Sequence, residues 1–250
     1  GCPVKCRASF SWVVKIIAFL ELKQKFIFFK GFELTLRKPV FYLFVFFSAL
    51  FLSGFLCGKP LFAYERYYVK RINDGDTIVL ADGRHIRYIG INAPEIAHEN
   101  KKAEHLGYAA KKYNKKLVLS KMVRLEFDKQ PHDRYGRTLA YVFLTNGVFV
   151  NKLMIEKGYA YCLPRRPNYK YDQVFLKAQR NAMSAKRGIW RGWREKKARY
   201  WGNKKSKRFH DTTCVFGKNI ARKNKIVFMG RWDAFWAGYA PCKKCIAGKR

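Results

Sequence analysis

Short β-rich runs dominate residues 64–190, and tight turns separate several of them. Alternating or continuous apolar positions predict five strands, over residues 67–72, 76–81, 84–91, 122–127 and 137–144. Asp82-Gly83 lies between the second and third runs, and Asn146-Gly147 follows the fifth. Both dipeptides favour hairpin turns.

Apolar residues at helical spacing predict about three helices in the same region. Leu106, Ala109/Ala110, Tyr113 and Leu117 indicate the first, and residues 149–157 and 171–187 indicate two more, each followed by glycine. Five short strands with these helices predict a mainly β, α+β domain over residues 64–190. We expect a five-stranded barrel of the OB type, a fold that commonly binds oligonucleotides on one face.

An uncharged run of 18 residues, 40–57, precedes this domain. Its length suits a marginal membrane span or the apolar core of a signal peptide, and Arg37 and Lys38 place its start in the cytoplasm. We therefore expect residues 1–63 to be a leader that exports the domain or anchors it in the cytoplasmic membrane, on the extracellular or periplasmic side. Cleavage near Ala63 and lipidation of Cys57 are both left open.

The net charge of the chain indicates which classes of molecule it binds. The chain has 52 Lys and Arg against 17 Asp and Glu, a net charge of +35, and 49% hydrophobic residues exclude an intrinsically disordered chain. Residues 191–250 alone carry 18 basic and three acidic side chains. Such a surplus attracts nucleic acid or an anionic membrane. Residues 191–207 have the composition of a basic linker.

Polar residues recur where the predicted strands begin and end. Asp76 opens one strand, Arg87 lies on the next, Asn92 and Glu95 follow its end, and Arg137 opens the last. Carboxylate, amide and carbonyl oxygens can bind a hard cation such as Ca²⁺, and two arginines can grip a phosphodiester. A nearby carboxylate can orient a water molecule or take its proton. Separately these residues are ordinary, but together they indicate phosphoryl chemistry.

Three motifs in order, DGDT (74–77), IRYIGINAPE (86–95) and DRYGR (133–137), resemble those of the thermonucleases, the staphylococcal nuclease-like proteins, over about residues 65–190. The resemblance implies an OB-fold barrel and Ca²⁺-dependent hydrolysis of DNA and RNA. It implies that Asp76, the Ala93 carbonyl and Asn92 bind calcium. Asn92 stands where the family usually has a second carboxylate, so the site loses a negative charge and we expect weaker calcium binding.

The same resemblance implies that Glu95 is the general base or orients water, and that Arg87 and Arg137 clamp the phosphate. The family also has two tyrosines that stack on nucleotides, and these cannot be assigned firmly here. Tyr159 and Tyr161 are candidates for substrate contact, together with Arg134, although tyrosines in such a stretch more often pack in the core.

The C-terminal residues contain a second ligand set. His210, Cys214, Cys242 and Cys245 form a Cys₃His group of the kind that binds structural zinc. The motifs FHDTTC (209–214) and GYAPCKKC (238–245) also resemble the small metal-binding module of the Ada repair protein, over about residues 208–247. The resemblance implies a zinc module over residues 208–250, and residues 231–237 are expected to form a short helix. A Cys242–Cys245 disulfide is the alternative, favoured if the chain is exported.

The sequence thus predicts a Ca²⁺-dependent nuclease that acts on DNA and RNA, with a basic zinc module that aids nucleic-acid binding. A catalytically inactive nucleic-acid-binding protein, silenced at Asn92, is the alternative from another class. A protein that binds anionic membranes would explain the charge but not the ordered motifs.

Overall fold

The computed structural model describes residues 65–99, 101–194 and 198–246, all within one compact unit. The predicted leader and its apolar run at 40–57 lie outside the described residues. Within the described part of the chain, no helix is long and apolar enough to cross a membrane.

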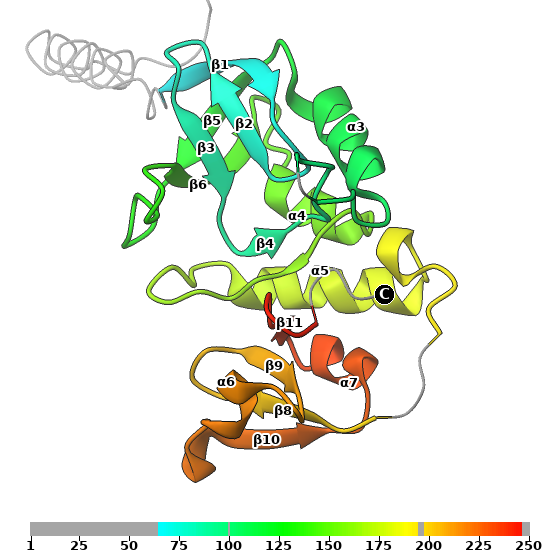
Figure 1. Ribbon diagram of the computed structural model, residues 1–250. Coiled ribbons are helices and arrows are strands. Elements are labelled where there is room, and N and C mark those ends of the chain that lie inside the picture. Colours follow the sequence, from blue (N-terminus) through cyan, green and yellow to red (C-terminus); the bar gives the residue numbers. More distant parts are fainter. Residues whose placement is uncertain (1–64, 100, 195–197, 247–250) are drawn as a thin grey trace, which may run out of the picture. The chain divides into compact units, whose positions relative to one another are not determined.

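Five strands close into a barrel in the order β1-β2-β3-β6-β5, as Figure 1 shows. Their bounds are β1 Arg66–Ile72, β2 Thr77–Leu80, β3 His85–Tyr88, β5 Met122–Glu126 and β6 Thr138–Leu144. The β3–β6 pair is parallel and the other pairs are antiparallel. Fully buried apolar side chains from alternate strand positions fill the interior, among them Val69, Ile78, Ile86 and Val123. The predicted barrel is therefore confirmed.

The predicted strand over 84–91 is wrong in one respect, because the chain turns at Gly90. This glycine has φ +77°, and a Cβ on it would meet Cε2 of Phe175 at 2.4 Å. β3 therefore ends at Tyr88, and β4 (Ile91–Asn92) leaves the barrel to pair with β7 (Tyr161–Cys162). This departure carries Asn92 and the residues after it away from the barrel wall.

Three helices cover the barrel and confirm the helical spacing in the sequence. They are α3 (Gly107–Val118), α4 (Val150–Glu156) and α5 (Asp172–Ser184). Leu106 itself lies before α3, with φ 66°. Helix α5 packs on α4 and β7, and it also contacts α7 (Arg231–Trp236) near the C-terminus.

The C-terminal residues form a second sheet in the order β10-β8-β9-β11. Its strands are β8 Tyr200–Asn203, β9 Arg208–Asp211, β10 Lys225–Phe228 and β11 Ala240–Pro241, with a short helix α6 at Val215–Lys218 and 3₁₀ turns η2 at Gly188–Trp190 and η3 at Arg222–Asn224. The expectation of a linker over 191–207 is thus wrong for its second half. β8 lies there and pairs with both β9 and β10, although basic residues surround it in the sequence.

A shared hydrophobic cluster joins this sheet to the end of the barrel domain. Trp190 of η2 packs edge-on against Phe235 of α7 at 5.0 Å, and Trp193 and Trp232 lie within 5.9 Å of Trp190. The side chain of Gln179 on α5, fully buried, donates to the Phe235 carbonyl and accepts from the Cys162 amide. The C-terminal sheet is therefore packed against α5 and η2 rather than tethered to them.

Candidate active site

A buried carboxylate, Asp76, is at the centre of the site. It directly precedes β2, accepts a hydrogen bond of 2.7 Å from the Ala93 amide and forms an ion pair of 3.1 Å with Arg87. Burial raises the pKa of Asp76 to about 6, against the opposing effect of Arg87. The carboxylate therefore carries a negative charge that one guanidinium compensates only in part.

The turn before Asp76 is fixed by a buried network. The Asp74 carboxylate accepts from the Asp76 amide at 2.8 Å, and its carbonyl accepts from the Asn114 side chain at 3.1 Å. Asn114, fully buried on α3, in turn accepts from the Tyr88 hydroxyl at 2.9 Å. The turn that the DGDT motif predicts is thus held in place by α3 and β3, which sets the direction of the Asp76 side chain.

Arg87 and Asn92 complete the network around Asp76. The Arg87 guanidinium donates to Asn92 Oδ1 at 3.1 Å and to the Tyr88 carbonyl at 2.7 Å. The Asn92 amide donates to the Ala93 carbonyl and to the Tyr161 hydroxyl, each at 3.0 Å. Four residues that the sequence singled out separately therefore contact one another.

The donor chemistry of this network fits a hard divalent cation. The Asp76 carboxylate, Asn92 Oδ1 and the Ala93 carbonyl are all oxygen donors, which Ca²⁺ prefers. The buried and incompletely compensated charge of Asp76 is the feature that a bound cation would neutralise. Only one of the side-chain donors is a carboxylate, because Asn92 supplies an amide oxygen.

Glu95 lies three residues beyond Asn92 and lines a pocket together with it. Tyr161, Lys101 and Glu104 line the same pocket. Backbone contacts fix this segment, since the Glu95 carbonyl accepts from the Glu104 amide at 2.9 Å. Gly107, the first residue of α3, approaches the same carbonyl so closely that a Cβ there would meet the oxygen at 2.3 Å.

Arg137 directly precedes β6, the strand that pairs with β3. Because Arg87 on β3 is in parallel register with Leu139, Arg137 is on the same face of the sheet as Arg87. Asp133 orients its guanidinium with contacts of 2.7 and 2.8 Å. The structure thus provides two arginines on one face, each held by an aspartate.

The two candidate tyrosines, Tyr159 and Tyr161, both make packing contacts, the more frequent arrangement for tyrosines in such a stretch. Tyr161 is only 6% exposed and its ring packs edge-on against Phe235, so it offers no free face for a nucleotide base. Tyr159 stacks on Tyr113 at 4.6 Å. An exposed ring is found instead at Tyr135, 67% exposed, with the guanidinium groups of Arg134 and Arg137 over it at 4.9 and 5.5 Å. The DRYGR motif contains Tyr135 between the two arginines, a signal that the sequence analysis missed.

The four predicted soft ligands also come together. The ligand atoms of His210, Cys214, Cys242 and Cys245 all lie within 4.8 Å of one another, which is compatible with one tetrahedral zinc ion. His210 is on β9, Cys214 begins α6, and the other two follow β11. Each of the three thiols is free, so the alternative Cys242–Cys245 disulfide is not formed in the structure.

Comparison with known proteins agrees with this geometry. Residues 85–192 match the protein family described as "Staphylococcal nuclease homologue". The chain is 41% identical over 129 residues to "Thermonuclease" of Staphylococcus hyicus and 40% identical over 129 residues to that of Staphylococcus intermedius, in each case covering 50% of this chain and 76% of the relative. It is 38% identical over 125 residues to "Endonuclease YncB" of Bacillus subtilis (strain 168), covering 48% of this chain and 59% of the relative. The chain therefore belongs to the staphylococcal nuclease family.

Proposed function

We propose that this protein is a calcium-dependent nuclease that hydrolyses phosphodiester bonds of DNA and RNA. The observation that carries the proposal is the contact network of Asp76, Arg87, Asn92 and Ala93, with Glu95 in the adjoining pocket. The names of the relatives, thermonuclease and endonuclease, support the same reaction class.

Each residue of the network has a distinct task in this proposal. Asp76, Asn92 and the Ala93 carbonyl hold the cation, which when bound polarises the phosphate and lowers the pKa of its water. Arg87 and Arg137 donate to the phosphate oxygens, and their aspartate partners keep both guanidinium groups oriented before substrate arrives. Glu95 orients the attacking water and accepts its proton.

The test is cleavage of single-stranded and duplex DNA by the full chain, with excess calcium or with chelator. Glu95→Gln is expected to lower kcat by roughly 10² to 10⁴-fold. Glu99→Gln is the matched control, because Glu99 is an exposed carboxylate four residues away. Salt-sensitive binding without cleavage at any calcium concentration would overturn the proposal and favour the inactive nucleic-acid-binding alternative.

A second variant tests the cation site itself. Asn92→Asp restores a carboxylate beside Asp76 and Arg87 and is expected to lower the calcium concentration for half-maximal activity by about tenfold or more. An unchanged calcium requirement in an active variant would place the cation away from Asn92.

The Cys₃His cluster is proposed to bind structural zinc, in a basic segment that raises affinity for nucleic acid. The resemblance of residues 208–250 to the Ada module and the convergence of the four ligand atoms support this assignment. One equivalent of zinc is expected in the purified full chain and none in Cys245→Ser. Cys162→Ser, a buried thiol on β7, is expected to keep it. Equal zinc in the two variants would contradict the assignment.

Residues 40–57 are proposed to export the protein or to anchor it in the membrane, on the strength of their length, lack of charge and basic flank. Fractionation of cells that express the full chain tests this. Recovery of the protein solely from the soluble cytoplasmic fraction would overturn it.

A further inference from the structure

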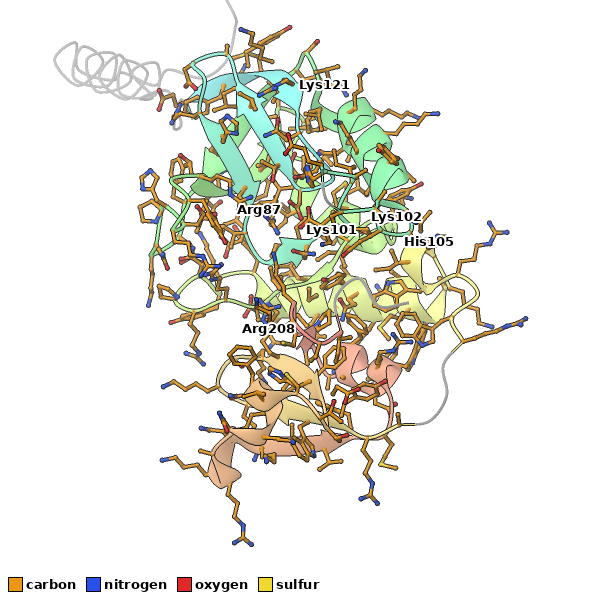
Figure 2. The ribbon with its side chains drawn as sticks, in the orientation of Figure 1. Arg87, Lys101, Lys102, His105, Lys121 and Arg208 are labelled. Atoms are coloured by element: carbon orange, nitrogen blue, oxygen red, sulfur yellow. The ribbon has the colours of Figure 1, made fainter. Side chains whose placement is uncertain are left out.

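The pocket that contains Glu95 also has walls from the C-terminal sheet. Arg208, the first residue of β9, and Lys243, between the two cysteines of the CKKC motif, line it together with Asn92 and Tyr161. Figure 2 labels Arg87 on the barrel and Arg208 near the C-terminal sheet. The pocket therefore combines a carboxylate of the nuclease motifs with cations from outside the segment that matches the family.

One donor atom of the Arg208 guanidinium lacks a partner. Its Nη1 atom is buried and has no hydrogen-bond partner among the described residues. Glu104, a carboxylate in the same pocket, is already engaged, by Lys101 at 3.7 Å and by the Glu95 amide at 3.3 Å. A buried donor of a charged group without a partner is costly, and beside a pocket it indicates a ligand that offers acceptor oxygens.

The backbone that carries Arg208 is held on both sides. Arg208 lies opposite Asn203 of β8 and opposite Ala240 of β11. His210 of the Cys₃His cluster follows two residues later, and Lys243 lies between two of the other ligands. The backbone of Arg208 is therefore fixed by both neighbouring strands, so that anion binding costs little backbone conformational entropy.

We propose that Arg208, with Lys243 beside it, is a phosphate subsite that binds a backbone phosphate of the nucleic-acid substrate next to the scissile one. The inference rests on the proposed nuclease function and deepens it, because it gives the C-terminal sheet a direct contact with the substrate. A guanidinium suits this task, since its fixed donors match the oxygens of a phosphate.

The variants are Arg208→Met, which keeps the apolar stem and removes the charge, and Arg208→Lys, which keeps the charge. Arg222→Met is the matched control, because Arg222 is an exposed arginine of the same sheet domain, in η3. With a single-stranded oligonucleotide and saturating calcium, Arg208→Met is expected to raise KM about tenfold with kcat changed less than about twofold. Arg208→Lys is expected to recover part of the loss.

Two further measurements separate a phosphate contact from a structural role. A dinucleotide with a single phosphate is expected to be cleaved equally by wild type and Arg208→Met, because it has no neighbouring phosphate. The Tm of Arg208→Met is expected to match or exceed that of the wild type, because the variant removes a buried donor that has no hydrogen-bond partner. An equal loss on both substrates, or a lower Tm with lost zinc, would overturn the proposal.

The Arg208 subsite can also be tested if the protein has no nuclease activity. Oligonucleotide affinity is measured without calcium in the Glu95→Gln background, with and without Arg208→Met. A wild type that never cleaves overturns the nuclease, whereas equal affinity of these two proteins overturns the Arg208 subsite. Faster cleavage by Arg208→Met would also overturn it, because it would mean that Arg208 obstructs the pocket.

Discussion

The Ala93 amide donates a hydrogen bond of 2.7 Å to the Asp76 carboxylate, and this contact joins the start of β2 to the segment that follows β4. Gly75 lies against the same segment, where a Cβ would meet the Cβ of Ala93 at 2.5 Å and that of Ala110 at 2.8 Å. We expect Gly75→Ala to separate Asp76 from Ala93 and to lower the rate of oligonucleotide cleavage by about tenfold or more.

Gly83→Ala is the control for that substitution. Gly83 has nothing within 4 Å of the added Cβ, but its φ of +87° is strained for alanine. A stability loss of about 1 kcal/mol with unchanged activity is therefore expected. If the two variants cleave equally well, the close packing of Gly75 does not position Asp76.

The contact between Asp133 and Arg137 leads to a second prediction. Asp133→Ala leaves the Arg137 guanidinium without its oriented partner, so we expect cleavage to fall by roughly tenfold in kcat/KM. Asp82→Ala breaks an ion pair of the same kind, to Arg84, in the turn between β2 and β3, and is expected to keep full activity. An equal loss of kcat/KM in Asp133→Ala and Asp82→Ala would mean that the loss comes from general destabilisation and not from the orientation of Arg137.

The pH dependence of stability follows in part from Asp172, the half-buried first residue of α5. Burial, with the negative charge of Asp128, raises the pKa of Asp172 to about 6. The folded protein therefore takes up a proton between about pH 6 and pH 4 that the unfolded chain binds only near pH 4, and the stability linked to this group rises as the pH falls. Asp172→Asn is expected to raise the free energy of unfolding near pH 7 by about 1 kcal/mol, discounted for partial exposure, and to have little effect near pH 4.

Glu126→Gln is the comparison of opposite sign. For both variants, urea titrations near pH 4 and near pH 7 measure the free energy of unfolding. Burial raises the pKa of Glu126, but hydrogen bonds from Lys170, Tyr171 and Arg124 outweigh it and hold the pKa below its usual value. Its contribution to stability is present near neutral pH and is lost as the pH falls through the folded pKa. Glu126→Gln is thus expected to be less stable than wild type near pH 7. Shifts of the same sign for both variants would contradict the assignment.

Gln179 connects two backbone groups across the junction of α5 with the C-terminal sheet. Gln179→Leu leaves the Cys162 amide and the Phe235 carbonyl buried without this partner, so we expect a loss of about 2–4 kcal/mol in the free energy of unfolding. Gln173→Leu, at an exposed position of the same helix, is expected to change it by less than about 0.5 kcal/mol. Similar values for both would mean that the junction does not depend on this bridge.

The barrel could be predicted because its signals are local. Alternation of apolar residues and turns such as Asp82-Gly83 depend on neighbours in the chain, and they placed all five barrel strands within a few residues. The departure of β4 from the barrel could not be predicted in this way, because Gly90 is required by the approach of Phe175, which lies 85 residues away in the chain.

The residues of the candidate site also fall into those that local motifs predict and those whose positions depend on distant segments. The DGDT and IRYIGINAPE motifs contain the residues that form the network, and DRYGR contains Arg137, so the sequence predicted this site through resemblance. The burial of Tyr161 and the position of Arg208 depend on packing between distant segments. β8 was not predicted, because basic residues surround it in the sequence. The strands that pair with it, β9 and β10, both follow it in the chain.

The indoles of Trp190, Trp193 and Trp232 lie within 5.9 Å of one another where η2 meets α7. Aromatic rings fixed at such distances give near-ultraviolet circular dichroism that disappears when tertiary packing is lost, even if secondary structure persists. The junction thus contains an optical reporter of its own. Release of the C-terminal sheet, for example by substitution at Gln179, would be visible without any label and before the barrel itself unfolds.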